Sequence, residues 1–285
     1  MVAPLAPRAD GVPVALSSVK KLVPAPVRDL IARCRAERRG HSGETLRHTY
    51  LGESLSVVVA DGMSRGWYGA DWPEGSRTEI DLLATLGLPR DGLIFDIGAH
   101  QGVVAILLKR KLAPQGRVVC VELNGTNAAA CTENFRLNGE DNMVCLHAAI
   151  SDRPGFVRVT GRSNGQIVAE PSMLNFLYPK VECLTVDDMI GRFGTPSLVF
   201  LDVEGAEVLA MKGAERALSS VNAWFIELHG DETCGQFGGS NRGIARVFAA
   251  AGFTLHTAVD EGPFFPLADP DAVTGERGYL VATRA

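Results

Sequence analysis

The chain has 285 residues, of which 46% are hydrophobic and 21% are charged, and its formal net charge at pH 7 is -5. A chain of this length and apolar content can bury a full core, so nothing indicates a disordered protein. The acidic balance argues against a general nucleic-acid binder, which usually carries a basic surface. No apolar run is long enough to span a membrane. The six cysteines form no Cys-x-x-Cys pair, and we expect reduced thiols in a cytoplasmic protein.

Residues 1–45 are predicted to form an N-terminal arm and a short basic helix. The first 24 residues are rich in Ala and Pro. Apolar side chains then recur at helical spacing, and seven cations but only two acids lie between Lys20 and Arg39. Three roles remain open for this helix: contact with an acidic partner, packing in a homo-oligomer, or a solvated position on the main domain.

One core domain is predicted over residues 46–285. Alternating apolar side chains in residues 46–60 indicate a strand, and residues 78–86 have the spacing of a helix. Residues 65–73 place two tryptophans and a tyrosine among glycines. Such a loop often borders a pocket, although packing against the core would explain it equally well.

Strands and helices alternate from residue 93 onward, except that residues 156–160 and 181–184 are both predicted as strands without a helix between them. The predicted strands cover residues 93–97, 117–121, 143–147, 197–201 and 223–228. This alternation predicts right-handed βαβ units and a mostly parallel sheet. Two further strands, at 253–257 and 279–283, are expected at an antiparallel edge. The glycine-rich residues 230–239 are predicted to form a long loop suited to a mobile lid.

Acidic side chains end the predicted strands at corresponding positions. Asp96, Glu122 and Asp202 each end one strand, and Glu227 and His229 end a later one. Ligands of such sheets bind beyond the carboxyl ends of the strands, where the strand order reverses. We therefore interpret these residues as the rim of a binding site.

The charge of this rim favours S-adenosylmethionine over a dinucleotide. Asp96 stands where a dinucleotide-binding turn has its first glycine, and its carboxylate would repel a pyrophosphate. S-adenosylmethionine has no phosphate and carries a sulfonium cation, which suits an acidic cleft. Glu122 is placed to accept hydrogen bonds from both ribose hydroxyls. An NAD(P)-binding oxidoreductase remains an alternative.

Six segments in order, DIGAHQG, VVCVELN, HAAISDRPG, CLTVDDM, FLDVEGAEVLAMKGA and FIELH, resemble the FkbM family of S-adenosylmethionine-dependent methyltransferases. The resemblance covers residues 93–229 as a cofactor-binding core and makes residues 46–285 the methyltransferase domain. It implies the α/β fold of class I methyltransferases, which is Rossmann-like, with a doubly wound, mostly parallel seven-stranded sheet. An antiparallel edge and an N-terminal extension of helix and strand complete the expected fold. The family usually methylates a hydroxyl on a sugar, glycan or natural product.

The resemblance also implies where the cofactor lies. The glycine turn would hold its methionine end, Glu122 its ribose, and the segment 142–149 its adenine. The implied cofactor contacts are Asp96, Gly98, Ala99, His100, Gly102, Glu122, Asn142, Ala149 and Asp202. Two residues depart from the family pattern: His100 stands where Asn is frequent, and Phe200 where Lys is frequent.

A catalytic base is needed only if the acceptor must lose a proton during methyl transfer. His229 is our first choice because the pKa of histidine lies near neutrality and the acidic neighbours would raise it, with Glu227 and Asp202 as rivals. These three side chains and Glu204 could instead bind a divalent cation that orients a diol, which the sequence does not favour. Glu204 and Glu207 could equally serve to stabilise a helix dipole from its first turn.

A small-molecule or glycan acceptor is therefore the expected partner. A protein or nucleic-acid methyltransferase is a second hypothesis. Against methylation of a base, the strand ending at Asp202 continues as Val-Glu-Gly-Ala-Glu and lacks an Asn/Asp-Pro-Pro-aromatic motif. A non-catalytic cofactor-binding protein is a third hypothesis, because Phe200 replaces the frequent lysine.

Overall fold

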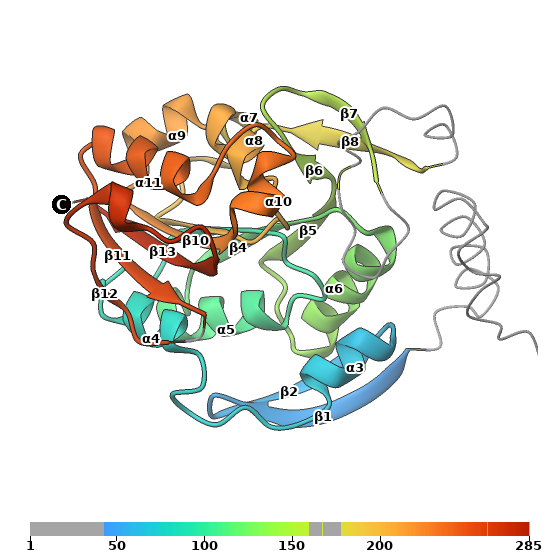
Figure 1. Ribbon diagram of the computed structural model, residues 1–285. Helices are drawn as coiled ribbons and strands as arrows, with labels where there is room; N and C mark the ends of the chain where they lie inside the picture. The colour runs from blue at the N-terminus through green and yellow to red at the C-terminus, as the bar shows by residue number, and fades with distance from the viewer. Residues whose placement is uncertain (1–42, 160–166, 168–177, 261, 285) are drawn as a thin grey trace, which may run out of the picture.

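The computed structural model describes residues 43–159, 167, 178–260 and 262–284. Within them, an eight-stranded sheet lies between two layers of helices (Figure 1). In spatial order, the strands of this sheet are β12 (Phe265–Pro266), β11 (Thr254–Val259), β13 (Arg277–Thr283), β10 (Ala223–His229), β9 (Leu198–Leu201), β3 (Leu93–Ile97), β4 (Arg117–Glu122) and β5 (Met143–His147).

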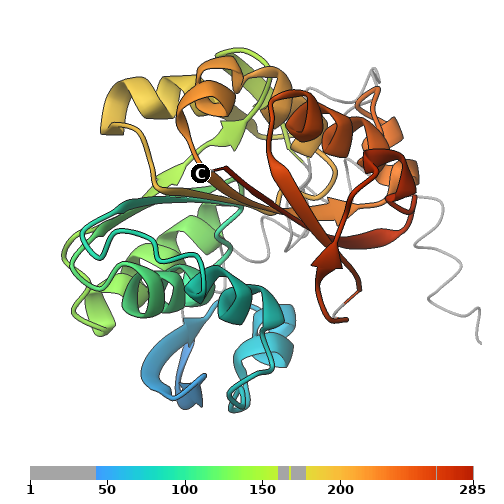
Figure 2. The ribbon, with the colours of Figure 1, turned by 90° about the vertical axis from the view of Figure 1, so that its left-hand side faces the viewer.

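Each face of the sheet is covered by its own group of helices (Figures 1 and 2). One face packs against α4 (Thr78–Ala84), α5 (Val103–Leu112) and α6 (Gly125–Leu137). The other face packs against α7 (Val186–Phe193), α8 (Glu207–Lys212), α9 (Glu215–Ser220) and α11 (Asn241–Ala250). Every residue of β3 is buried, as expected for a parallel strand covered on both sides. No described helix has the length and apolarity needed to cross a membrane.

The strand order confirms the predicted class I methyltransferase fold. Seven strands form the predicted doubly wound sheet, and the two-residue strand β12 adds an eighth at the edge beyond β11. β13 pairs antiparallel with both β10 and β11, which confirms the antiparallel edge. β3 pairs in parallel with β4 on one side and β9 on the other, so the order reverses at β3. A ligand site is expected beyond the carboxyl end of β3.

A separate hairpin precedes the main sheet. The single strand predicted over residues 46–60 is in fact two antiparallel strands, β1 (Glu44–Tyr50) and β2 (Glu53–Val59), which lie outside the α6 layer (Figure 1). Asn134 and Asn138 on α6 exchange hydrogen bonds with the backbone of Val58 and Ser56 in β2. The predicted basic helix falls outside the described residues.

Two predicted loops contain helices. The aromatic segment 65–73 begins within α3 (Gly62–Tyr68), whose first turn is capped by the Asp61 side chain. The glycine-rich segment 230–239 begins with α10 (Asp231–Gly235), and Cys234 is fully buried there. The glycines in both segments have a low helix propensity, so the sequence did not predict these helices. The helices form because caps and buried contacts outweigh that low propensity. The prediction of a long irregular lid loop is therefore wrong.

A small second sheet follows β5. It contains β6 (Ala149–Ile150), β8 (Lys180–Leu184) and β7 (Gly155–Arg158), in that spatial order. This sheet explains why the regular alternation of strands and helices is interrupted in the sequence between β5 and α7.

The turn after β3 depends on Gly98. Its φ is +95°, and a Cβ there would overlap with the carbonyl oxygen of Asp202 at the end of β9. Gly139 is a matched control, since its φ is +70° but a Cβ there would meet no atom within 4 Å. Both alanine variants carry the cost of a left-handed backbone, about 1–2 kcal/mol.

We expect Gly98→Ala to lower the free energy of unfolding by about 1–3 kcal/mol more than Gly139→Ala does, because the strand ends must move apart. Urea denaturation of both variants measures the difference. Equal losses would show that the contact between the two strand ends is not tight.

Candidate active site

Two adjoining cavities open at the carboxyl ends of the parallel strands. The first encloses about 790 Å³ of space, part of which is open to solvent. Its lining includes Glu122, Leu123, Asn127, Ala149, Ile150 and Glu204. The second is lined by residues that include Tyr68, Trp72, Arg77, Asp96, Ala99, Phe200, Glu227 and Tyr279. Both are bordered by Trp67, Gly98, His100, Asp202 and Arg277.

Glu122 is held rigidly in the wall of the first cavity. Its Oε1 accepts a hydrogen bond from the backbone N–H of Asn124 at 2.6 Å, and its Oε2 accepts one from that of His100 at 2.8 Å. Burial raises the pKa of Glu122 to about 7, although these hydrogen bonds oppose the shift. A carboxylate has about four acceptor positions, so Glu122 can still bind a ligand hydroxyl.

His100 connects the glycine turn to the aromatic residues of α3. Its Nδ1 lies 2.9 Å from the Tyr68 hydroxyl, and its ring meets that of Trp67 edge-on with centroids 5.0 Å apart. Burial lowers the pKa of His100 to about 4, against a smaller opposing effect of Asp61, so the ring is neutral at pH 7. The buried Nε2 has no hydrogen-bond partner among the described residues.

Asp96 is buried, and it forms no ion pair with any residue that the structure describes. Its side chain reaches the second cavity, and its Oδ2 has no hydrogen-bond partner in the described part of the chain. Burial raises the pKa of Asp96 to about 7. The neighbour in register on β9 is Phe200, which stacks on Phe225 with ring centroids 4.1 Å apart.

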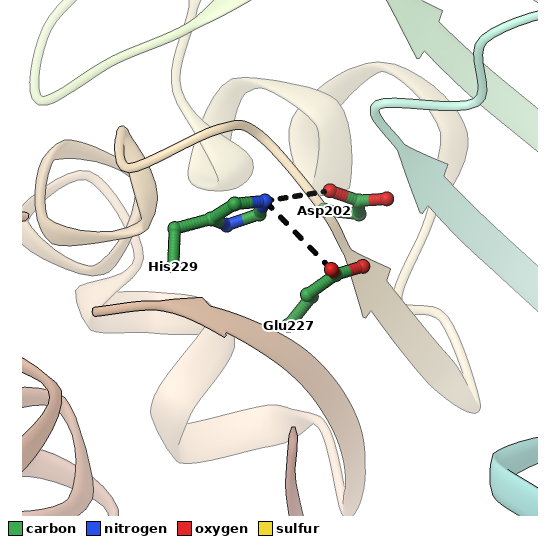
Figure 3. A group of neighbouring side chains, drawn as sticks. All are labelled: Asp202, Glu227 and His229. Atoms are coloured by element: carbon green, nitrogen blue, oxygen red, sulfur yellow. Dashed lines mark ion pairs between the residues drawn. The ribbon is translucent and has the colours of Figure 1, made fainter. Parts of the chain in front are cut away.

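His229 lies at the centre of a cluster of carboxylates (Figure 3). Its Nε2 is 3.5 Å from Asp202 Oδ1, 3.7 Å from Glu204 Oε2 and 3.9 Å from Glu227 Oε1. On the other side of the ring, Nδ1 lies 2.9 Å from Glu207 Oε1. Burial lowers the pKa of His229, but the hydrogen bond and charge of Glu207 and the other acids outweigh it and raise the pKa to about 9.

This geometry does not support His229 as the base that contacts the acceptor. The His229 side chain is only 4% exposed and lines neither cavity. Asp202 is 35% exposed and borders both cavities. Burial and the nearby Glu227 carboxylate raise the pKa of Asp202 well above its usual value. Of the three predicted candidates, Asp202 is therefore the best placed to accept a proton from an acceptor.

Two of the predicted cofactor contacts lie away from both cavities. Asn142 precedes β5 at the amino end of the strand, where its side chain donates to the carbonyl of Gly116 at 2.5 Å. Gly102 is the N-cap of α5, and a Cβ there would lie 2.6 Å from Cys131 Sγ on α6. Asn142 therefore belongs to the opposite edge of the sheet, and Gly102 serves helix packing.

The other predicted contacts divide between the two cavities. Ala149 and Glu122 line the first, whereas Asp96 and Ala99 line the second. Arg277 was not predicted from the sequence as a site residue. Its Nε donates a hydrogen bond to Glu227 Oε1 at 2.7 Å. Antiparallel pairing of β13 with β10 brings Arg277 opposite His229, and no local motif signals such a pairing.

The family model of the methyltransferase FkbM domain matches residues 96–255, which is more than half of the chain and includes the carboxyl ends of the parallel strands β3, β4 and β9. The chain belongs to the FkbM methyltransferase family. This confirms the family that the six sequence segments indicated.

Several named methyltransferases resemble this FkbM-family chain over part of their length. It is 28% identical over 141 residues to ribosomal protein L11 methyltransferase of Rhodopseudomonas palustris (strain BisB5), covering 49% of this chain and 43% of that protein. It is 25% identical over 162 residues to hexuronic acid methyltransferase AglP of Haloferax volcanii, covering 54% of this chain and 63% of that protein. The chain thus spans about half the length of these relatives.

The chain also resembles solved methyltransferase structures at low sequence identity. Methyltransferase FkbM from Methylobacillus flagellatus KT aligns at a TM-score of 0.44 with 14% identity, covering 68% of this chain and 44% of that one.

Both departures from the frequent residues of the FkbM family have a local explanation. The backbone at His100 has a φ of +50°, a conformation that Asn and His adopt more readily than most residues, so the turn is retained. At Phe200, stacking on Phe225 replaces a charged side chain. Asp96, in register beside Phe200, consequently lacks a cation at this position.

The pKa of Glu122 has a consequence for stability. Because burial raises it from 4.5 to about 7, the folded state retains a proton that the unfolded state releases between these pH values. Stability from this group is therefore full below pH 4.5 and is lost as the pH rises through about 7. Asp96 acts in the same direction.

We expect Glu122→Gln to reduce the loss of unfolding free energy between pH 5 and pH 8, by up to about 3 kcal/mol. Urea denaturation of the ligand-free protein at both pH values measures this. Equal losses in the variant and the parent protein would show that Glu122 ionises at its ordinary pKa.

Proposed function

We propose that this protein transfers a methyl group from S-adenosylmethionine to a hydroxyl of a sugar, glycan or small natural product. The observation that carries this proposal is the junction of the two cavities, where an acid-rimmed pocket meets a cleft with aromatic walls. Asp202 and Trp67 border both cavities. A donor in the first cavity and an acceptor in the second would therefore meet beside Asp202.

The residues of the first cavity fit S-adenosylmethionine. Glu122 presents a fixed carboxylate for the ribose hydroxyls, and Leu123 and Ile150 offer apolar surface for the adenine ring. Asp202 and the adjoining Asp96 provide negative charge for the sulfonium and ammonium groups. When bound, the cofactor supplies an electrophilic methyl group.

The residues of the second cavity suit a sugar. Trp67 is 45% exposed, so the flat apolar face of its ring is available to the C–H face of a sugar ring. The buried Tyr68 packs edge-on against Trp67 and supports its position. Arg77 and Arg277 also line this cavity and would attract an acceptor that carries a carboxylate. The similarity to a hexuronic acid methyltransferase supports this choice of acceptor.

The chemistry needs alignment and one proton acceptor. The acceptor oxygen forms a bond to the methyl carbon while the carbon–sulfur bond breaks, and the electron pair of that bond remains on sulfur. We assign the hydroxyl proton to Asp202, because this carboxylate borders both cavities. The walls of the two cavities would hold donor and acceptor in line, which accounts for most of the acceleration in such a displacement.

Loss of the Glu122 carboxylate should weaken cofactor binding. We expect Glu122→Ala to reduce the affinity for S-adenosylmethionine by about 1.5–3 kcal/mol, the contribution of hydrogen bonds to a charged group. Calorimetric titration at pH 8, where the carboxylate is ionised, measures this. Glu133→Ala on the exposed face of α6 is the control and should bind normally. Unchanged affinity of the Glu122 variant would remove the ribose assignment.

Loss of the proton acceptor should slow the reaction after binding. We expect Asp202→Asn to lower the rate of methyl transfer about 100-fold or more, as loss of general base catalysis does. The rate is measured with methyl-labelled cofactor at saturating concentration. A rate equal to that of the parent protein would exclude Asp202 as the base.

The function is tested by incubating the protein with methyl-labelled S-adenosylmethionine and a panel of neutral sugars, uronic acids and cell extract. We expect the label in an O-methyl group of a carbohydrate or small molecule. Label in protein or nucleic acid would favour the second hypothesis from the sequence. Binding of NAD without binding of S-adenosylmethionine would refute the proposal.

A further inference from the structure

The Nε2 atom of His229 is buried in an unusual environment. The side chain is 4% exposed, and Nε2 has no hydrogen-bond partner among the described residues. Figure 3 shows this atom directed at the carboxylates of Asp202 and Glu227, which come from the neighbouring strand end and from the same strand. A buried polar atom that faces ligand-type oxygens without bonding to them indicates that a further group belongs between them.

We propose that Asp202, Glu227 and His229 bind a single divalent metal ion. Their ligand atoms all lie within 4.8 Å of one another, with Nε2 3.5 Å from Asp202 Oδ1 and 3.9 Å from Glu227 Oε1. Metal bonds to such atoms are about 2.0–2.2 Å long, which separates adjacent ligand atoms by about 3–3.6 Å and opposite ones by about 4–4.4 Å. The Nε2 to Oδ1 distance lies within these limits, and a shift of the Glu227 side chain by a few tenths of an ångström towards the ion would complete the set. The three atoms are therefore spaced as ligands of one ion.

Glu207 orients the imidazole ring for this role. Its Oε1 lies 2.9 Å from Nδ1 of His229 and also accepts hydrogen bonds from the backbone N–H groups of Val203 and Gly205, each at 3.2 Å. The Glu207 side chain is fully buried. Histidines that bind metals almost always donate their other ring N–H to a carboxylate, a backbone carbonyl or water, and this bond directs the lone pair of the free nitrogen at the metal. In addition to stabilising the dipole of α8, Glu207 would therefore position His229 to bind the ion.

The charge of the cluster also requires compensation. Four carboxylates surround His229, and the cation paired with Glu227 is Arg277, whose side chain is 59% exposed. A divalent ion would take the place of the proton on Nε2 and neutralise more of the negative charge than that proton does. Because Arg277 and His229 both approach Glu227 Oε1, the ion would lie on the His229 side of this carboxylate.

The ligand atoms select the type of metal. One imidazole nitrogen and two carboxylate oxygens suit Mn²⁺, Fe²⁺ or Zn²⁺ better than Ca²⁺, which prefers oxygen ligands alone. Asp202 and Glu227 line the second cavity, so open coordination positions would face the acceptor. If the proposed function holds, the ion would bind acceptor oxygens there and make a hydroxyl more acidic. Asp202 would then bind the ion through Oδ1, and its other oxygen would accept the hydroxyl proton.

Binding of Mn²⁺ by the full chain tests this site without any methyl donor or acceptor. The protein is stripped with a chelator and titrated with Mn²⁺, and the electron paramagnetic resonance signal of free Mn²⁺ is followed. We expect uptake of one ion per chain. Asp202→Asn and His229→Gln should each bind at least about 10-fold more weakly, and Glu207→Gln about 10–100-fold more weakly.

His48→Gln is a matched control. His48 also pairs with a carboxylate, Asp71 at 3.0 Å, but it lies on β1 and lines neither cavity. This variant should bind Mn²⁺ as the parent protein does. Near-ultraviolet circular dichroism checks that each variant is folded. Asparagine has nearly the shape of aspartate, and position 202 is partly exposed, so we expect Asp202→Asn to fold. This variant allows the test even if His229→Gln does not fold.

Absence of Mn²⁺ uptake, with no uptake of Zn²⁺ in a parallel titration, would overturn the proposal. Equal binding by His229→Gln would also overturn it, because an acidic patch alone would bind the ion without the imidazole. Methyl transfer is a separate readout. A metal-loaded protein that transfers no methyl group to any acceptor would contradict the proposed function and leave the metal site intact. Full transfer by the stripped protein would instead overturn the role of the ion in orienting the acceptor.

Discussion

The close contact between the turn after β3 and the end of β9 is the constraint on which the candidate site depends. The backbone N–H of Asp202 donates to the carbonyl of Ile97, and those of Gly98 and Ala99 donate to Val121 on β4. Three strand ends are thereby tied together by backbone atoms alone. Only a residue without a Cβ fits at the point of contact. Backbone contacts alone therefore fix the position of Asp202 at the wall that the two cavities share.

The parallel core could be predicted from the sequence because its signals are local. Apolar runs that end in Asp96, Glu122 and Asp202 mark three strands, and the topology of such a sheet places their ends together. The same local signal is absent for Arg277 and for the contact of Glu207 with His229. Both depend on pairings between distant segments, which neither spacing nor composition encodes.

The sequence predicted the position of the site histidines better than their chemical roles. His229 lies at the expected strand end, yet surrounding carboxylates raise its pKa to about 9, and it lines neither cavity. The direction of this pKa shift follows from the acidic residues in the sequence, but the burial of the ring away from both cavities does not. His100 shows the opposite effect, since burial lowers its pKa to about 4. The pKa values of the two histidines thus lie about five pH units apart. His229 is surrounded by acids, whereas His100 is buried beside aromatic rings.

The N-terminal hairpin bears on how copies of this protein behave at high concentration. A strand at the edge of a sheet normally leaves backbone groups open to another chain, which is a route to aggregation. Along β2, Asn134 and Asn138 occupy the backbone N–H and carbonyl groups of Val58 and Ser56, and they do so from successive turns of α6. The helix thus takes the place of a neighbouring strand. A foreign strand would have to displace four hydrogen bonds before it could add to this side of the hairpin.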